Sequence, residues 1–195
     1  YDTAIKELQV GKGVSSLKET LYGLEALEKI EVEDGNESYI SEDGVLYNKE
    51  KTILIRYPQS KSDQTEYKVP EGVKTIGENA FKGNKTITKI ELPKSVQSIG
   101  DHAFIYCGSM EEMKLSEGLE TIGSYAFAYC KGITKTELPD SVKSIGEKAF
   151  YYCEGLEEAV LGKGLKKVGY FTFQYCKKLT RLIVRGNIES IDTNV

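Results

Sequence analysis

The sequence is poor in the side chains on which most active sites and metal centres depend. It contains no tryptophan and a single histidine, His102, among its 195 residues. One histidine without a second ligand nearby builds neither a familiar metal site nor a histidine-based catalytic triad. We therefore expect His102 to be exposed and without a role, and we nominate no catalytic, cofactor-binding or metal-ligating residue.

Neither a strong charge of one sign nor a long apolar run is present. Lysine and arginine total 26 and aspartate and glutamate 30, for a net charge of −4. This balance does not indicate binding to nucleic acid or to an anionic membrane surface. No apolar stretch approaches the roughly 18 residues of a membrane-spanning helix, so no membrane insertion is expected. The chain begins at Tyr1 without a charged-then-apolar leader, and we expect any signal peptide to lie outside it.

What the chain has in abundance is internal repetition with a period of 23 residues. A phenylalanine recurs at this step, and so do an isoleucine or valine five positions before it and a glycine four positions before it. The phenylalanines are Phe81, Phe104, Phe127, Phe150 and Phe173. A fixed period between roughly 20 and 50 residues is the signature of a solenoid of stacked units. A lone unit buries too little apolar surface to offset its ordering entropy, so stability is expected to come from stacking.

Each unit is expected to contain two short parallel strands and a helical turn. In one unit, a strand points Ile90 and Leu92 inward, and Pro93 ends it because proline cannot donate to a ladder. A second strand follows over 96–99. A short helical or 3-10 turn is then predicted over 101–106, after a glycine that relieves the backbone, with Asp101 as its N-cap. The predicted fold is a right-handed superhelical repeat solenoid of the α/β type.

The whole chain, 1–195, is expected to be a single domain of such units. Its expected parts are a degenerate N-terminal repeat at 8–32, an insertion at 33–68, five 23-residue repeats at 69–183 and a partial repeat at 184–195.

The insertion breaks the period and predicts a β-hairpin. Two apolar runs, 45–47 and 52–57, flank a polar loop, which is the pattern of paired antiparallel strands. We expect this hairpin to project from the solenoid between units. Glu42 and Asp43 precede a glycine, but calcium-loop spacing is absent and turn chemistry explains them.

The four cysteines share one position of the repeat. Stacked strands lie roughly 4.8 Å apart, so the four sulfurs spread over about 14 Å and cannot share one zinc ion. Neighbours fall within the Cα range of a disulfide, roughly 4.4–6.8 Å. Small buried apolar fillers are the alternative, and we expect this column of free thiols. The cysteines are Cys107, Cys130, Cys153 and Cys176.

The outward positions of the longer strands form two columns in which opposite charges alternate. The first column is Lys89, Glu112, Lys135, Glu158 and Arg181, and the second is Glu91, Lys114, Glu137, Val160 and Ile183. Lateral neighbours of opposite charge stabilise a sheet by about 0.2–1 kcal/mol per pair. The columns are either a binding surface on a concave face or a solvated face that neutralises itself. Val160 and Ile183 make its C-terminal end more apolar.

A third column consists of tyrosines, which present a large contact area at low entropic cost. It contains Tyr106, Tyr129, Tyr152 and Tyr175, with Tyr125, Tyr151 and Tyr170 nearby. Either it contacts a protein or sugar, or its rings only pack over the outside of the turns. We expect the column to be at least partly exposed.

The repeat resembles the BspA-like subclass of bacterial leucine-rich repeats. The motif Leu-Pro-x-x-Val-x-x-Ile-Gly-x-x-Ala-Phe-x-x-Cys is legible at Leu92-Pro93, Val96, Ile99-Gly100, Ala103-Phe104 and Cys107. The resemblance covers 69–191 strongly and 8–32 weakly. It implies a leucine-rich-repeat superhelix in a secreted or wall-attached bacterial protein, of a kind often linked to adhesion. The family has no shared catalytic residues, so none is carried over.

These observations predict a non-enzymatic interaction or adhesion module of an extracellular or cell-surface bacterial protein. Its partner is expected to be a protein or glycoprotein, including one of a host, and the chain itself a monomer without cofactors. The alternatives are a structural spacer and an ancillary domain of a larger secreted protein.

Overall fold

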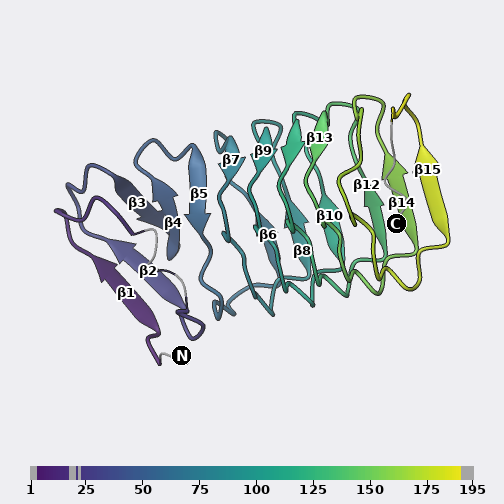
Figure 1. The fold of residues 1–195 in the computed structure, drawn as a ribbon. Coiled ribbons are helices and arrows are strands. Elements are labelled where there is room, and N and C mark those ends of the chain that lie inside the picture. Colours follow the sequence, from purple (N-terminus) through teal and green to yellow (C-terminus); the bar gives the residue numbers. More distant parts are fainter. Residues whose placement is uncertain (1–3, 18–20, 22, 190–195) are drawn as a thin grey trace.

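The chain forms an elongated solenoid with its two termini at opposite ends (Figure 1). The computed structural model describes residues 4–17, 21 and 23–189. Within these residues all regular secondary structure is β-strand, and none of them forms a helix long and apolar enough to cross a membrane. The predicted solenoid of parallel strands is therefore confirmed, but its assignment to the α/β type is wrong.

Two faces of the solenoid carry parallel strands, and most repeats contribute one strand to each face (Figure 1). Paired residues in the array from β6 onward are 23 positions apart, as in the pair Lys89 and Glu112. The longer strands are β6 (Glu66–Lys68), β8 (Lys89–Glu91), β10 (Glu112–Lys114), β12 (Lys135–Glu137), β14 (Glu158–Leu161) and β15 (Arg181–Val184). The shorter strands are β7 (Thr75–Ile76), β9 (Ser98–Ile99), β11 (Thr121–Ile122) and β13 (Ser144–Ile145).

The N-terminal end combines one shortened parallel unit with an antiparallel sheet. The parallel strands β1 (Glu7–Val10) and β2 (Lys29–Val32) pair. The strands β3 (Tyr39–Glu42), β4 (Val45–Asn48) and β5 (Ile53–Arg56) pair antiparallel in that order. The predicted hairpin corresponds to β4 and β5, and β3 adds a third strand to it.

This hairpin does not project from the solenoid as expected. Instead β5 pairs in parallel with β7, so the antiparallel strands continue one face of the solenoid. Val45 and Tyr47 pack in the core of the repeats, whereas Leu46 between them packs in a separate N-terminal core. A strand buried on both faces has a continuous apolar run, and Val45-Leu46-Tyr47 is such a run. The antiparallel sheet therefore forms the partition between two cores.

The segment after each short strand is a series of tight turns and contains no helix. The N–H groups of His102, Phe104 and Tyr106 donate to carbonyls of the next repeat at 2.9, 2.7 and 2.9 Å. The N–H groups between them close turns within the same repeat. A helix needs every interior N–H for its own i−4 carbonyl, so these donations exclude one. Asp101 is accordingly no N-cap, and its Oδ1 accepts from the backbone N–H of Ser124 at 2.7 Å.

We call these bonds between successive repeats the turn ladder. It recurs from segment 79–83 through 102–106 and 125–129 to 148–152, always with the earlier repeat donating to the later one. The turn ladder thus links the repeats on a third side of the solenoid, in addition to the two strand faces.

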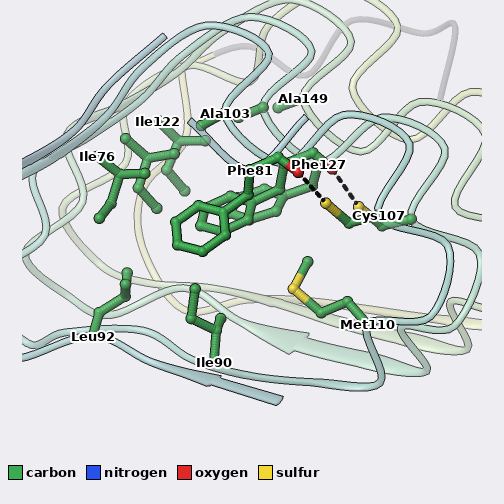
Figure 2. Close-up of a cluster of buried hydrophobic side chains, with 14 of the residues drawn as sticks. Ile76, Phe81, Ile90, Leu92, Ala103, Cys107, Met110, Ile122, Phe127 and Ala149 are labelled. Carbon is green, nitrogen blue, oxygen red and sulfur yellow. Dashed lines mark hydrogen bonds between the residues drawn. The ribbon is translucent and has the colours of Figure 1, made fainter. Parts of the chain in front are cut away.

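A spine of stacked phenylalanine rings fills the centre (Figure 2). Successive ring centroids from Phe81 to Phe173 lie 4.8, 5.2, 5.0 and 5.6 Å apart with interplanar angles of 18° or less. The buried ring of Tyr57 extends the spine at 5.1 Å from Phe81. Equivalent side chains therefore lie directly above one another, which is the premise of the repeat assignment.

The cysteines are buried free thiols beside this spine, as expected (Figure 2). They also act as donors, since the Cys107 thiol donates to the Phe81 carbonyl of the preceding repeat at 3.0 Å. Cys130, Cys153 and Cys176 repeat this bond at 3.1 Å. Asn84 takes the position in the earlier copy, and its Nδ2 donates to the Gln59 carbonyl at 3.2 Å. Burial raises the pKa of the Cys130 and Cys153 thiols, which keeps both protonated.

The recurring glycine allows successive repeats to approach closely. A Cβ on Gly100 would lie 2.8 Å from the Glu78 backbone nitrogen, and one on Gly123 would lie 2.6 Å from the Gly100 carbonyl carbon. Neither position has a left-handed backbone. The glycine is therefore required by the contact between repeats, and the expected relief of a helical turn is not its role.

Candidate interaction surfaces

The first candidate surface is the charged strand face, formed by the outward residues of β8, β10, β12, β14 and β15. Its charges pair between neighbouring repeats as the alternation predicts. Lys89 contacts Glu112 at 3.2 Å, Glu91 contacts Lys114 at 3.0 Å, and Glu158 contacts both Lys135 at 2.8 Å and Arg181 at 3.0 Å. Lys114 holds the pKa of Glu91 below its usual range, and Lys135 does the same for Glu158. This surface neutralises itself.

The pairing is interrupted at one junction of this face. The strands β10 and β12 do not pair in the described structure, so the face divides into two three-stranded sheets. The expected contacts of Glu112 with Lys135 and of Lys114 with Glu137 do not form there. Beneath the junction, Thr136 takes an inward position that Ile90 and Ala159 fill elsewhere. Its Oγ1 is buried without a hydrogen-bond partner among the described residues. The core beneath this junction therefore contains an unsatisfied polar group.

Val160, which was expected to make the C-terminal end of this face more apolar, is not exposed there. It is only 2% exposed, and Ile183 beside it is half-buried. Arg185 forms an ion pair with Glu137 at 2.7 Å, two repeats away, and the strand between them carries Val160. This ion pair therefore crosses the C-terminal end of the charged strand face.

The second candidate surface is the tyrosine ladder, formed by Tyr106, Tyr129, Tyr152 and Tyr175 at the ends of the turns. Tyr106 and Tyr175 are 51% and 48% exposed, and the two between them are partly exposed, as predicted. Successive ring centroids lie 4.8, 5.1 and 4.5 Å apart, with interplanar angles of 30°, 14° and 38°. The four rings form a continuous stack along the solenoid axis.

Tyr151 completes this aromatic patch in a different orientation. Its ring meets those of Tyr129, Tyr152 and Tyr175 at 77°, 64° and 80°, with centroids 5.7, 5.0 and 5.5 Å away. Edge-to-face contacts of this kind stabilise aromatic clusters by about 0.5–1.5 kcal/mol each. Tyr151 therefore braces three members of the ladder at once.

Every tyrosine of the ladder has a left-handed backbone, with φ between 57° and 63°. This region disfavours side chains with a Cβ, and a bulky residue there is a genuine outlier. The earlier copy has Gly83 at the same position, with φ 70°. Strained backbone conformations of this kind persist where packing or function requires the side chain. The left-handed backbone could have been predicted from the sequence, because a glycine replaces the tyrosine in one copy of the repeat.

A second row of left-handed residues flanks the ladder and was not recognised in the sequence. It contains His102, Tyr125, Lys148 and Phe171. His102 is half-buried with its ring stacked on Tyr125 at 5.2 Å and 9°, so the expectation of an exposed histidine is wrong.

Lys148 joins the two rows of aromatic residues. Its Nζ donates to the Tyr125 hydroxyl at 2.8 Å, contacts Glu147 at 3.1 Å, and lies 5.2 to 5.9 Å from three ring centroids. These oxygens raise the pKa of Lys148, which keeps it charged.

Two hollows near the N-terminal end are lined mainly by polar groups, and a third, beside Leu17, Tyr39 and Ile53, is mainly apolar. One of about 660 Å³ is lined by Glu7, Glu28, Asp43 and Asp63 among others, and its lining holds no histidine or cysteine. Glu28 and Asp63 are already paired with Lys6 and Lys61. No group of three or more potential metal ligands comes together in the part of the chain that the structure describes.

Comparison with known proteins places these surfaces on a known type of scaffold. Residues 74–195 match the family model of the BspA-type leucine-rich repeat region in six copies. No curated protein matches the chain.

Solved structures of bacterial leucine-rich repeat proteins superpose over nearly the whole chain. The pneumococcal vaccine antigen PcpA is 30% identical with a TM-score of 0.83, covering 97% of this chain and 46% of its own. A leucine-rich cell surface protein from Faecalibacterium prausnitzii is 28% identical with a TM-score of 0.86, covering 95% and 49%. A leucine-rich repeat protein from Eubacterium ventriosum is 28% identical with a TM-score of 0.78, covering 94% and 50%. The chain thus spans about half the length of these relatives.

Proposed function

Because the chain belongs to the BspA-type leucine-rich repeat family, we propose that it is a non-enzymatic interaction module of a secreted or cell-surface bacterial protein. The F. prausnitzii relative is described as a cell surface protein, which supports this location. The module acts as a monomer and meets an extracellular protein or glycoprotein, including one of a host. Solenoids commonly present one long face to such partners.

The observation that carries the proposal is the exposed tyrosine ladder. Its side chains hold a strained backbone conformation that glycine holds without strain at the equivalent position of the earlier copy. Tyrosine supplies large, rigid contact area with a polar tip, which suits recognition. The charged strand face is the weaker candidate, because its ion pairs already satisfy one another.

The test is binding to immobilised mucin and to purified extracellular-matrix proteins, measured by surface plasmon resonance. The ladder variant is Tyr129→Gly with Tyr152→Gly, which removes two rings at positions where Gly83 shows that glycine fits. The matched control is Lys135→Glu with Glu158→Lys, which reverses one ion pair on the other surface and removes the pairing of Glu158 with Arg181.

We expect at least one probe to bind the wild type, and we expect the ladder variant to lose roughly tenfold in affinity while the charge-reversal control keeps it. Loss in the control alone would move the function to the charged strand face. Equal binding by all three proteins would refute a role for the ladder.

A structural spacer is the second candidate function. The phenylalanine spine and the turn ladder link repeats along the whole array, which favours a stiff element that holds another domain away from a surface. An ancillary domain of a larger secreted protein would share this architecture. Absence of binding to every probe, with the fold intact, would favour these alternatives.

A further inference from the structure

The outward surface of the tyrosine ladder presents ring edges and hydroxyls, because the ring faces cover one another. Rings stacked 4.5 to 5.1 Å apart leave little room for a ligand between them. The edge of an aromatic ring carries the positive part of its quadrupole, and the phenol adds an O–H donor. Burial raises the pKa of the Tyr129 and Tyr151 hydroxyls, so both stay protonated. Such a surface suits a ligand rich in hydrogen-bond acceptors.

The charges beside the ladder are paired, which disfavours a charged ligand. On one side Lys148 is held by Glu147 and the Tyr125 hydroxyl. On the other side Glu154 pairs with Lys131 at 3.0 Å and with Lys177 at 2.5 Å. Electrostatic complementarity selects partners whose charge matches the surface they meet. Each of these charged groups already has a partner, although two lysines share Glu154, and this pairing disfavours a strongly charged ligand.

Apart from its tyrosines, the ladder lacks the side chains that usually anchor a protein partner. Among the described residues, the large apolar side chains that are well exposed are Ile5, Ile53, Leu182, Val184 and three tyrosines, and only Tyr106 and Tyr175 of these belong to the ladder. Protein interfaces are enriched in arginine and methionine as well as aromatic residues. Their absence from the ladder favours a ligand that is recognised by aromatic and hydroxyl contacts alone.

The regular spacing of identical side chains fits a ligand that is itself periodic. Four tyrosines repeat at a step set by the distance between stacked strands, roughly 4.8 Å. This step is comparable with the length of one sugar unit in an extended β-linked polysaccharide. Sugars carry hydroxyl and ether oxygens on every unit, and these acceptors match the positive ring edges and the phenol donors.

On the basis of the proposed function, we infer that the ligand of the tyrosine ladder is an uncharged linear polysaccharide running along the solenoid axis. Each of the four tyrosines contacts one sugar unit. A glycoprotein partner is then recognised through such a glycan and not through its polypeptide.

The experiment titrates the whole chain with β-1,4-linked glucose and N-acetylglucosamine oligomers, from the dimer to the hexamer, by isothermal titration calorimetry. We expect the affinity for at least one series to rise with each added unit up to the tetramer and then to level off, since four rings are available. The Tyr129→Gly/Tyr152→Gly variant is expected to lose roughly tenfold or more.

Two further variants separate loss of the site from loss of the fold. Tyr129→Phe with Tyr152→Phe keeps the ring stack and removes two donors, and it too should bind more weakly. Tyr170→Ala removes an exposed ring outside the ladder and should bind normally. Thermal unfolding followed by circular dichroism confirms that each variant is folded.

The outcomes distinguish this inference from the proposed function. If mucin or a matrix protein binds through the ladder but neither oligomer series binds, the polysaccharide inference fails and the interaction module stands. If heparin binds through the ladder in place of the neutral oligomers, the assignment of an uncharged ligand is wrong. If neither oligomers nor glycoproteins depend on the ladder, the polysaccharide inference fails together with the role of the ladder in the proposed function.

Discussion

At the scale of single residues, the left-handed tyrosines reverse an ordinary rule of substitution. Alanine is usually better tolerated than glycine in ordered structure, because glycine has more backbone entropy to lose. At Tyr129, with φ 62°, an alanine keeps the steric strain of a Cβ whereas a glycine removes it.

We expect Tyr129→Gly to be more stable than Tyr129→Ala by about 1 kcal/mol. Urea unfolding of the two variants measures the difference. The same pair of substitutions at Lys135, in a regular strand, should show the opposite order. A more stable alanine at both positions would mean that the left-handed conformation is not costly here.

Thr136 offers a stabilising substitution. Its Oγ1 is buried and unpaired among the described residues, and its side chain is 3% exposed. A buried hydroxyl without a partner costs about 1–3 kcal/mol, so Thr136→Val should raise the free energy of unfolding by about 1–2 kcal/mol. Thr134→Val, at an exposed position two residues earlier, serves as the control and should change little. A destabilised Thr136→Val protein would show that the hydroxyl has a partner after all.

Single residues also mark the limit of what the sequence could predict for the surfaces. The period placed Tyr106 and its equivalents in one exposed column, because equal spacing implies equal environment. It did not reveal that Val160 is buried, nor that Arg185, which lies outside the strand alternation, pairs with Glu137 two repeats away. The period does place His102 next to Tyr125, 23 residues later, but it does not indicate the left-handed backbone at both residues.

At the scale of elements, the junction between the antiparallel sheet and the repeats rests on three buried tyrosines. The Tyr47 and Tyr67 hydroxyls share a hydrogen bond of 2.7 Å, and the Tyr57 ring packs edge-on against Tyr67 at 4.8 Å. Burial raises the pKa of Tyr47 and of Tyr57 to about 12, from an ordinary value of 10.0. The pKa of Tyr67 is raised by the same cause.

Alkaline pH should therefore loosen this junction. In the unfolded chain these phenols lose their protons near pH 10, while Tyr47 and Tyr57 in the folded protein keep them to about pH 12. Their contribution is complete below pH 10 and declines as the pH rises towards 12, because the unfolded state then binds fewer protons. Urea unfolding across this range measures the slope. Tyr57→Phe should make the slope shallower, and Tyr170→Phe, at an exposed ring, should not.

The strands were predicted well, because apolar alternation marks them in the sequence. The turn segment was predicted poorly. The strands of the array and the hairpin pairing of β4 with β5 followed from apolar alternation and turn residues. The helical turn over 101–106 was wrong, because its N–H groups donate to the next repeat and a single unit gives no sign of that. The position of the hairpin between two cores could have been predicted from the run Val45-Leu46-Tyr47, because this run has no polar face.

At the scale of the whole molecule, the distance between repeats depends on the recurring glycines. A Cβ on Gly146 would lie 2.6 Å from the carbonyl carbon of Gly123 in the preceding repeat, and backbone cannot move aside as a flexible side chain can. Since every repeat contacts only its neighbours, a local separation interrupts the whole stack.

Gly146→Ala is expected to lower the free energy of unfolding by about 3 kcal/mol. The matched control is Gly108→Ala, because a Cβ there would meet nothing within 4 Å and the backbone is not left-handed. That variant should stay within about 0.5 kcal/mol of the wild type. Chemical denaturation compares them, and equal stability of the two variants would contradict the close contact between repeats.

The turn ladder has an electrical consequence for the solenoid. All its N–H groups point from the earlier repeat to the later one, so the peptide dipoles in the turns add along the axis. Their positive ends point to the C-terminal end of the array and their negative ends to the N-terminal end, the reverse of an α-helix. The array is therefore polar from end to end along this side. Any further unit that stacks in the same direction lengthens that dipole, and a unit stacked in reverse meets it with like poles facing.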